Sequence, residues 1–266
     1  MEPMLTVALN AARKAGQIVE RAIDRLDKVN VENKSRNDFV TQIDKASEKE
    51  IIYHLHKAYP DHCIQAEETG LHGNEDSDYR WVVDPLDGTT NFIHGIPHFA
   101  VSIACVHKNR ITHAVVYDPI KREEFTASRG QGAALNGRRI RVSERRNLDG
   151  ALFGTGIPFS GYALEHMDAY LKCLHEISKQ CAGIRRAGAA ALDLAYVAAG
   201  RFDGFWELGL KPWDVAAGAL LITEAGGLVS DFKGGNDFLN GGNIVAANPK
   251  LLKFLLPIVE KHLGYL

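Results

Sequence analysis

The sequence predicts an α+β fold in which helices pack against mainly antiparallel sheet. Over residues 5–58 the apolar side chains recur at helical spacing, which indicates two amphipathic helices. Over residues 99–142 the pattern changes to short apolar strands separated by tight turns, among them Asn136-Gly137, a dipeptide typical of two-residue hairpins. Strands joined by such short turns run antiparallel, because parallel neighbours need a long crossover connection. These hairpins argue against a purely parallel, doubly wound fold.

The first half of the chain is expected to contain two helices followed by strands. The opening helix places Leu5, Leu9 and Val19 on one face. The second helix is expected to start after Asn37-Asp38 and to stop at Pro60. Strands are expected at residues 81–83, where Pro85 breaks the chain out of the sheet, and at residues 99–107, 111–117, 133–135 and 138–142.

The second half mixes helices and strands. Helices are expected at residues 162–179, 189–199 and 214–225, and a last one after Asn248-Pro249, which supplies an N-cap and a first-turn proline. Strands are expected at residues 151–155, 202–207, 228–231 and 244–247. No long linker interrupts the chain, so residues 1–266 are expected to form a single domain of two closely packed halves with a boundary near residue 150.

The composition is ordinary for a globular protein, with 45% hydrophobic and 24% charged residues and a net charge of −2. No apolar run approaches the roughly 20 residues that cross a bilayer. Arg13 and Lys14 interrupt the N-terminal apolar stretch, which favours an amphipathic helix over a signal sequence. We therefore expect a cytoplasmic protein without a membrane partner. The four cysteines are scattered without a CxxC pair, which argues against a zinc site or a disulfide framework.

The most informative segment spans residues 81–91, with the sequence WVVDPLDGTTN. An apolar strand delivers Asp84, and Asp87 follows after Pro85 and Leu86, with Gly88 permitting an unusual backbone angle. Two carboxylates and the Leu86 carbonyl would converge there, beside a helix start at residues 89–91. Oxygen ligands of this kind favour Mg²⁺ or Mn²⁺ over Zn²⁺. The alternative is an acidic turn without a ligand, because Asp and Gly are common turn residues.

Three further acidic residues are candidates for the same site. Glu67 lies in the segment QAEETG after a short apolar stretch, Asp214 stands where a helix should begin, and Glu207 stands at a strand end. The alternatives are a solvent-exposed pair for Glu67, a plain N-cap for Asp214 and a solvated position for Glu207.

A basic segment is the candidate for an anionic group. Arg185 and Arg186 are followed by Gly188, Ala189 and Ala190 at the start of a helix. This arrangement is typical of a cradle for an anion, and equally of a solvent-exposed loop.

Together these segments resemble the inositol monophosphatase family, and within it the bacterial branch. The resemblance is carried by AEET around Glu67, WVVDPLDGTTNF over residues 81–92, and WDVAAG with EAGG over residues 213–227. The segments DFVTQID at residues 38–44 and GIRRAGAAALD at residues 183–193 also match. Order and spacing agree over essentially the whole chain, which makes the joint match far more specific than any one segment.

The resemblance implies a layered αβαβα sandwich of the metal-dependent sugar phosphatase type, assembled as a homodimer, requiring Mg²⁺ and sensitive to Li⁺. It assigns the catalytic roles to Glu67 and Thr89, with Thr89 oriented by Asp44. The metal ligands that it implies are Glu67, Asp84, the Leu86 carbonyl, Asp87 and Asp214. The substrate contacts that it implies are Glu67, Leu86, Asp87, Gly88, Thr89, Arg185, Gly188, Ala189, Ala190, Glu207 and Asp214.

The reaction that the resemblance implies is hydrolysis of a small phosphate monoester, myo-inositol 1-phosphate, to inositol and phosphate by a metal-activated water. Fructose 1,6-bisphosphate, NADP or a 3′-phosphoadenosine nucleotide would need the same metal core. A regulatory protein bound to transcription antitermination factors is the alternative from another class. Phosphatases that form an aspartyl phosphate usually have one residue between their two Asp residues. Here two residues separate Asp84 from Asp87, which favours direct attack by water.

Overall fold

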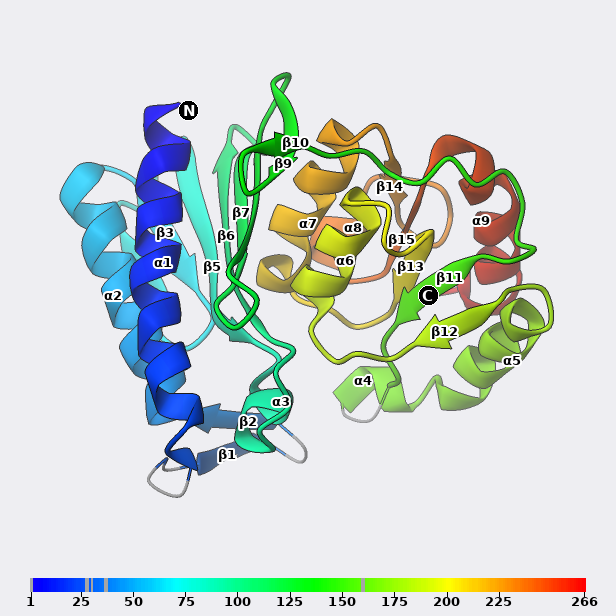
Figure 1. Cartoon of the computed structure of the whole chain (residues 1–266), viewed down its shortest axis with the longest axis horizontal. Helices are drawn as coiled ribbons and strands as arrows, with labels where there is room; N and C mark the ends of the chain where they lie inside the picture. The colour runs from blue at the N-terminus through cyan, green and yellow to red at the C-terminus, as the bar shows by residue number, and fades with distance from the viewer. Residues whose placement is uncertain (1, 27–28, 30, 36–37, 159–160) are drawn as a thin grey trace.

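The computed structural model describes residues 2–26, 29, 31–35, 38–158 and 161–266 as five layers in the order helices, sheet, helices, sheet, helices (Figure 1). The described part of the chain therefore confirms the αβαβα sandwich. None of its helices is both long and apolar enough to cross a membrane.

The outer layer consists of α1 (Pro3–Ile23) and α2 (Gln42–Ala58), which lie against the first sheet. Helix α1 approaches the sheet closely at Gly16, where an added Cβ would lie 2.5 Å from Cε1 of Tyr117. The predicted start of the second helix was too early. Residues Asp38–Thr41 form β2, which pairs with β1 (Val31–Ser35), and Asn37 lies outside the described residues. The helix begins at Gln42 because Thr41 caps it through its hydroxyl and its backbone.

The first sheet has eight strands in the order β10-β9-β8-β7-β6-β5-β3-β4. Only β3 and β5 run parallel; the other neighbours are antiparallel, as predicted. The strands are β3 (Cys63–Ala66), β4 (Gly70–Gly73), β5 (Tyr79–Asp87), β6 (Ala100–His107), β7 (Arg110–Asp118), β8 (Glu123–Ser128), β9 (Gly132–Leu135) and β10 (Arg138–Arg139).

Strand β5 corrects the prediction that the chain leaves the sheet at Pro85. The strand continues to Asp87, with Asp84 opposite Ser102 and Asp87 opposite Ala100. Pro85 and Leu86 therefore form a β-bulge, where a missing proline N–H breaks no regular ladder bond. A five-residue helix, α3 (Thr89–Ile93), follows at once.

Two other predictions about the first sheet were incomplete. Strands β3, β4 and β8 were not predicted, and the strand expected at residues 138–142 ends at Arg139. The chain then crosses to the second half, where the N–H of Val142 donates to the carbonyl of Ala225.

The central layer holds α6 (Ala190–Ala198), α7 (Pro212–Glu224) and the short α8 (Phe238–Gly241). Helices α6 and α7 are apolar on nearly all sides because a sheet covers each face of the layer. They pack tightly at Gly218, where an added Cβ would lie 2.4 Å from Cβ of Leu194.

The second sheet has five strands in the order β12-β11-β13-β15-β14. Strand β11 runs parallel to both neighbours, and the remaining pairs are antiparallel. The strands are β11 (Leu152–Thr155), β12 (Gly183–Arg185), β13 (Gly204–Glu207), β14 (Leu228–Ser230) and β15 (Ile244–Ala247). Strand β12 was not predicted.

The last layer contains α5 (Met167–Ser178) and α9 (Pro249–Leu263) on the outer face of the second sheet. The helix predicted at residues 162–179 is interrupted: α4 (Gly161–Leu164) ends before α5 begins. Tight bonds from the N–H groups of Glu165 and His166 to carbonyls three residues earlier separate the two helices. Asn248 caps α9 as predicted, accepting from the N–H of Lys250 at 2.8 Å.

Three large apolar clusters fill the spaces between the layers. One lies between the outer helices and the first sheet, one surrounds α6 and α7, and one lies between the second sheet and α5 and α9. Cys63, Cys105 and Cys173 are buried as free thiols.

Candidate active site

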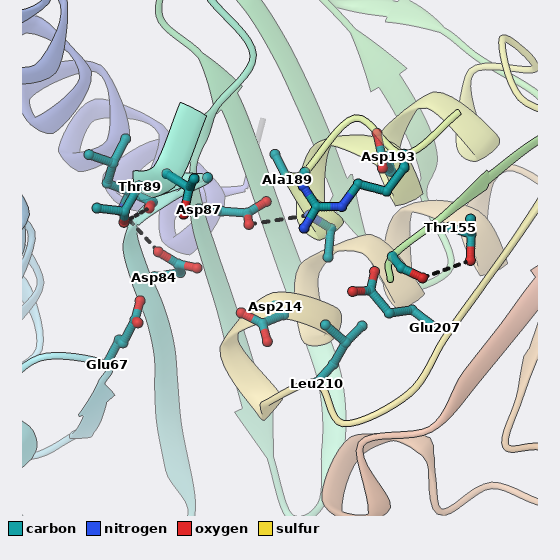
Figure 2. Close-up of a pocket in the computed structure, with 17 residues that line it drawn as sticks. Glu67, Asp84, Asp87, Thr89, Thr155, Ala189, Asp193, Glu207, Leu210 and Asp214 are labelled. Atoms are coloured by element: carbon teal, nitrogen blue, oxygen red, sulfur yellow. Dashed lines mark hydrogen bonds between the residues drawn. The ribbon is translucent and has the colours of Figure 1, made fainter. Parts of the chain in front are cut away.

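A cavity of about 250 Å³ lies where elements from both halves of the chain end or begin. Figure 2 shows that its lining comes from β5 and the start of α3 on one side and from the starts of α6 and α7 on the other. The lining residues are Glu67, Asp84, Leu86, Asp87, Gly88, Thr89, Thr90, Thr155, Gly156, Arg186, Gly188, Ala189, Ala190, Asp193, Glu207, Leu210 and Asp214.

Three carboxylates converge in this cavity. Asp84, Asp87 and Asp214 each offer an oxygen, and the three oxygens lie within 4.8 Å of one another (Figure 2). Burial raises the pKa of Asp84 well above its ordinary value, and the nearby charges of Glu67, Asp87 and Asp214 raise it further. Burial also raises the pKa of Asp87 to about 7. The cluster therefore concentrates negative charge in a place with little water to screen it.

The chemistry of the donors fits a hard divalent cation. Among the described residues, the cavity lining contains carboxylates and backbone groups but no His and no Cys. Oxygen donors without nitrogen or sulfur suit Mg²⁺ better than Zn²⁺. A bound cation would also offset the mutual repulsion of the carboxylates.

Asp87 connects the two halves of the molecule. Its carboxylate accepts hydrogen bonds from the backbone N–H groups of Ala190 at 3.2 Å and Ala191 at 2.8 Å, at the start of α6. The preceding residue, Ala189, occupies the N-cap position but has no side chain that can cap the helix. Gly88 has a φ of +95°, which glycine adopts without strain, and it lies close to Ala189. A Cβ added at Gly88 would be 3.2 Å from the Cβ of Ala189.

Asp214 is held by the first turn of α7. The helix starts at Pro212, so Asp214 is its third residue rather than the N-cap. Its Oδ2 accepts the backbone N–H of Lys211 at 2.7 Å, which fixes one oxygen. Ser102 on β6 donates to the carbonyl of Trp213 at 3.0 Å and so ties this turn to the first sheet.

Thr89 and Asp44 form a hydrogen-bonded pair at the edge of the cluster. The Thr89 hydroxyl lies 2.9 Å from Oδ1 of Asp44 and 3.0 Å from the Leu86 carbonyl oxygen. Asp44 is buried, and its other oxygen accepts the backbone N–H of Thr41 at 2.8 Å. Burial raises the pKa of Asp44, although its hydrogen bonds oppose this shift. Asp44 lies behind Thr89 and does not line the cavity itself.

The bulge of β5 is also supported from α2. Ser47, which is fully buried, donates its hydroxyl to the carbonyl of Pro85 at 2.8 Å. Leu86 donates its N–H to Oδ1 of Asp84 at 2.9 Å. Both contacts hold the segment between the two Asp residues.

The far side of the cavity carries Glu207 and Arg186. Burial raises the pKa of Glu207 well above its ordinary value, Asp193 and Asp214 add to the shift, and Arg186 opposes it. Gly156 leaves the space that the Glu207 side chain occupies, because an added Cβ would lie 1.7 Å from Oε1 of Glu207.

Asp193 on α6 is a further acidic residue of the lining. It is almost fully buried, and its Oδ1 lies 3.3 Å from Nε2 of His98. Burial raises the pKa of Asp193, and the contact with His98 opposes this shift.

The structure brings together most residues that the sequence singled out, but it separates the two arginines. Arg185 ends β12 with an exposed side chain whose Nη1 donates to the carbonyl of Ile184, and it does not line the cavity. Arg186 does. The sequence analysis named Arg186 in the basic segment but did not include it among the substrate contacts. The lining residues that it did not select are Thr90, Thr155, Gly156, Asp193 and Leu210. A charged residue in the otherwise apolar segment AALDLA was the available signal for Asp193.

Comparison with known proteins gives a consistent result over the whole length. A family model described as the inositol monophosphatase family matches residues 1–263. A curated relative, Nus factor SuhB of Pseudomonas aeruginosa, is 60% identical over 265 residues, which covers 99% of this chain and 98% of that protein.

Two solved structures show the same architecture. The extragenic suppressor protein SuhB of Bartonella henselae superposes with a TM-score of 0.94 at 46% identity, covering 98% of this chain and 99% of that one. The Thermotoga maritima IMPase superposes with a TM-score of 0.88 at 35% identity, covering 99% of each chain. The chain therefore belongs to the inositol monophosphatase family.

Proposed function

We propose that the protein is a Mg²⁺-dependent phosphomonoesterase whose substrate is myo-inositol 1-phosphate. Membership of the family makes the chain a phosphatase. The observation that carries the finer proposal is the convergence of Asp84, Asp87 and Asp214 beside the hydrogen-bonded pair of Thr89 and Asp44.

The carboxylates divide between two cation positions. Glu67, Asp84 and the Leu86 carbonyl would hold one ion, and Asp84, Asp87 and Asp214 would hold the other. When bound, a pair of Mg²⁺ ions lowers the pKa of a water molecule and stabilises the oxygen that leaves phosphorus.

The residues around the cluster orient the attacking water. The Thr89 hydroxyl hydrogen is directed toward Asp44 or the Leu86 carbonyl, since both are acceptors within 3.0 Å. The oxygen of Thr89 is then free to accept a hydrogen bond from water in the cavity. Glu67 supplies a carboxylate that can receive the proton of that water.

The opposite wall binds the rest of the substrate. Arg186 offers a fixed positive charge for an anionic group, and Glu207 offers a carboxylate that can accept hydrogen bonds from ring hydroxyls. The backbone at Gly188, Ala189 and Ala190 completes the wall. We assign the cationic contact to Arg186 in place of Arg185.

A panel of phosphate esters tests the proposal. We expect myo-inositol 1-phosphate to have the highest kcat/KM, ahead of fructose 1,6-bisphosphate, NADP and 3′-phosphoadenosine nucleotides. A different leading ester would overturn the substrate, and no hydrolysis of any ester with Mg²⁺ would overturn the activity. An ester made chiral at phosphorus should be hydrolysed with inversion, because one direct displacement by water inverts the centre.

Three further properties belong to the same proposal: assembly as a homodimer, a cytoplasmic location and inhibition by Li⁺. The three carboxylates of one cation position would also bind a small monovalent ion. We expect inhibition at about tens of millimolar Li⁺, the range of weak ion binding. Activity indifferent to that concentration would contradict the Li⁺ proposal, and a monomeric mass by light scattering would contradict the dimer.

A second candidate function rests on the 60% identical relative, which is named a Nus factor. We propose that this protein also associates with transcription antitermination factors. The wild-type protein and an Asp87→Asn variant should capture the purified factors equally, since this role does not need catalysis. Failure of both proteins to bind would remove the second function and leave the phosphatase proposal untouched.

A further inference from the structure

Helix α2 buries three acidic or polar side chains, those of Asp44, Ser47 and Glu48. The proposed reaction does not use Glu48. Glu48 follows Ser47 on the same helix and lies one turn after Asp44. It has 0% exposure and does not line the cavity. A buried carboxylate needs hydrogen-bond donors, so its partners indicate what it does.

Both oxygens of Glu48 accept hydrogen bonds from the loop after β3. Oε2 accepts the backbone N–H of Glu68 at 2.8 Å, and Oε1 accepts the hydroxyl of Thr69 at 2.5 Å. The Thr69 oxygen also lies 2.5 Å from Nε2 of His72. Because the single hydroxyl hydrogen of Thr69 points to Glu48, Nε2 of His72 is the donor in the second contact.

These contacts act on Glu67 through the backbone. The peptide group before the Glu67 Cα is held because the N–H of Glu67 donates to the carbonyl of Val83 at 3.1 Å. The peptide group after it is held because the N–H of Glu68 donates to Glu48. With both flanking peptide groups fixed, the direction of the Cα–Cβ bond of Glu67 is fixed as well.

The direction of Glu67 matters because its side chain lines the same cavity as the cluster of Asp84, Asp87 and Asp214. Figure 2 shows the carboxylate of Glu67 directed toward Asp84. Glu67 is nevertheless the one acidic residue of the proposed metal site that comes from a loop outside β5 and α7. Its placement therefore depends on what holds that loop.

We propose that Glu48 is a positioning residue, which holds the loop at Glu67 in the orientation that the metal site requires. The inference rests on the proposed function, since it assumes that Glu67 is a ligand. Glu48 itself contacts neither substrate nor metal. Outer contacts of this kind typically change metal affinity by about 10- to 100-fold.

Three substitutions separate this role from ordinary stabilisation of a loop. Glu48→Ala removes both hydrogen bonds. Glu48→Gln keeps both, because its carbonyl can accept from Glu68 while its amide donates to Thr69, which then donates to His72. Thr69→Val removes one of the two bonds to Glu48, together with the contact between Thr69 and His72, and leaves Glu48 in place. A matched control is Glu224→Gln, since Glu224 accepts the N–H groups of Gly130 at 2.7 Å and Gly132 at 2.8 Å outside the cavity lining.

The readout is direct binding of Mn²⁺, followed by electron paramagnetic resonance, together with the Mg²⁺ concentration that gives half-maximal activity. We expect Glu48→Ala to weaken both by about tenfold or more, Thr69→Val by about threefold, and Glu48→Gln and Glu224→Gln by less than about twofold. Far-ultraviolet circular dichroism confirms that each variant is folded. If Glu48→Ala does not fold, Thr69→Val decides.

Two kinds of failure are distinguishable. A wild-type protein that binds no Mn²⁺ would remove the proposed function on which the inference depends. A wild-type protein that binds Mn²⁺, with a folded Glu48→Ala variant that binds it equally well, would overturn the role of Glu48 alone. If Glu48→Ala does not fold, an unchanged Mn²⁺ affinity of the Thr69→Val variant would likewise overturn the role of Glu48.

Discussion

The backbone N–H of Ala191 donates a 2.8 Å hydrogen bond to Oδ2 of Asp87, so a carboxylate from the first half closes the start of a helix in the second. Helix α6 has no capping side chain of its own, because Ala189 stands at the N-cap. The same carboxylate lies in the acidic cluster with Asp84 and Asp214. Asp87 therefore contributes both to the site and to the joining of the two halves.

The substitution Asp87→Asn should consequently have two effects. Turnover should fall by at least about a hundredfold, since stabilisation of developing charge is lost. The free energy of unfolding in EDTA should fall by about 1–3 kcal/mol, because asparagine has one acceptor oxygen for the two N–H groups. Asp84→Asn is the control, since within the described residues Asp84 accepts one backbone N–H, that of Leu86. Equal losses of stability in urea titrations of the two variants would contradict the capping role.

Removal of divalent cations should destabilise the wild-type protein. A cation that binds only the folded state adds about 2.7 kcal/mol to the free energy of unfolding at a concentration of 100 times its Kd. We expect Mg²⁺ to raise the melting temperature relative to EDTA, and NaCl of equal ionic strength to have little effect. The Asp84→Asn variant should lose most of the Mg²⁺ response. An identical response in that variant would show that Mg²⁺ acts elsewhere.

The hydroxyl of Thr89 should affect kcat rather than KM. Thr89→Val keeps the shape of the side chain but removes the oxygen that lies 2.9 Å from Asp44. Loss of a group that orients the attacking water should lower kcat by about a hundredfold with little change in KM. Thr89→Ser retains the oxygen and should keep most of the activity. Steady-state kinetics in which Val and Ser behave alike would exclude this role.

The two neighbouring arginines should differ. Both arginines are exposed, but Arg186 lines the cavity and Arg185, at the end of β12, does not. Arg186→Ala should raise KM by about tenfold or more, since a hydrogen bond to a charged group contributes about 1.5–3 kcal/mol. Arg185→Ala should change KM less than about twofold. The reverse result would restore the assignment to Arg185.

Gly156 should be intolerant of a side chain because of Glu207. A methyl group there would lie 1.7 Å from Oε1 of Glu207, so Gly156→Ala must displace that carboxylate. We expect a higher KM and a loss of about 1–3 kcal/mol in unfolding free energy. Gly183→Ala on the neighbouring strand is the control, because its closest contact is the exposed end of Arg185 at 3.2 Å. Adding Glu207→Ala to Gly156→Ala should recover the stability; no recovery would place the strain elsewhere.

The layered fold was predictable where the local pattern was strong. The helix of residues 3–23 and the hairpin of β6 and β7 have clear periodicity. Strands β3, β4, β8 and β12 were missed. Strands β3, β4 and β12 have only three or four residues each, and Glu123–Ser128 mixes charged and apolar residues. The start of α2 was placed too early because the pairing of β1 with β2 is a tertiary feature without a local signal.

The candidate site was predictable in its acidic residues and less so in its far wall. Asp84, Asp87 and Glu67 lie in short segments whose order along the chain is informative. Successive side chains of an extended segment point to opposite faces, so only one of Arg185 and Arg186 can point toward the cavity. Because β12 was not predicted from the sequence, the directions of these two side chains could not be assigned.

The bulge at Pro85 and Leu86 changes which face of the sheet the following side chains of β5 point to. Trp81 and Val83 contact the cluster under the outer helices, while Val82 contacts the central cluster, so odd and even residues of this strand face opposite layers. By that alternation Asp84 would face the central layer and Asp87 the outer helices. The extra residue of the bulge shifts the count by one, and Asp87 reaches Ala191 in the central layer instead. The two carboxylates are three residues apart in the sequence, yet they face the same layer, as two residues at a spacing of two would in a regular strand. If β5 paired regularly here without the bulge, one of the two carboxylates would face the apolar layer behind the sheet, whereas deletion of a single bulge residue would leave both on the same face.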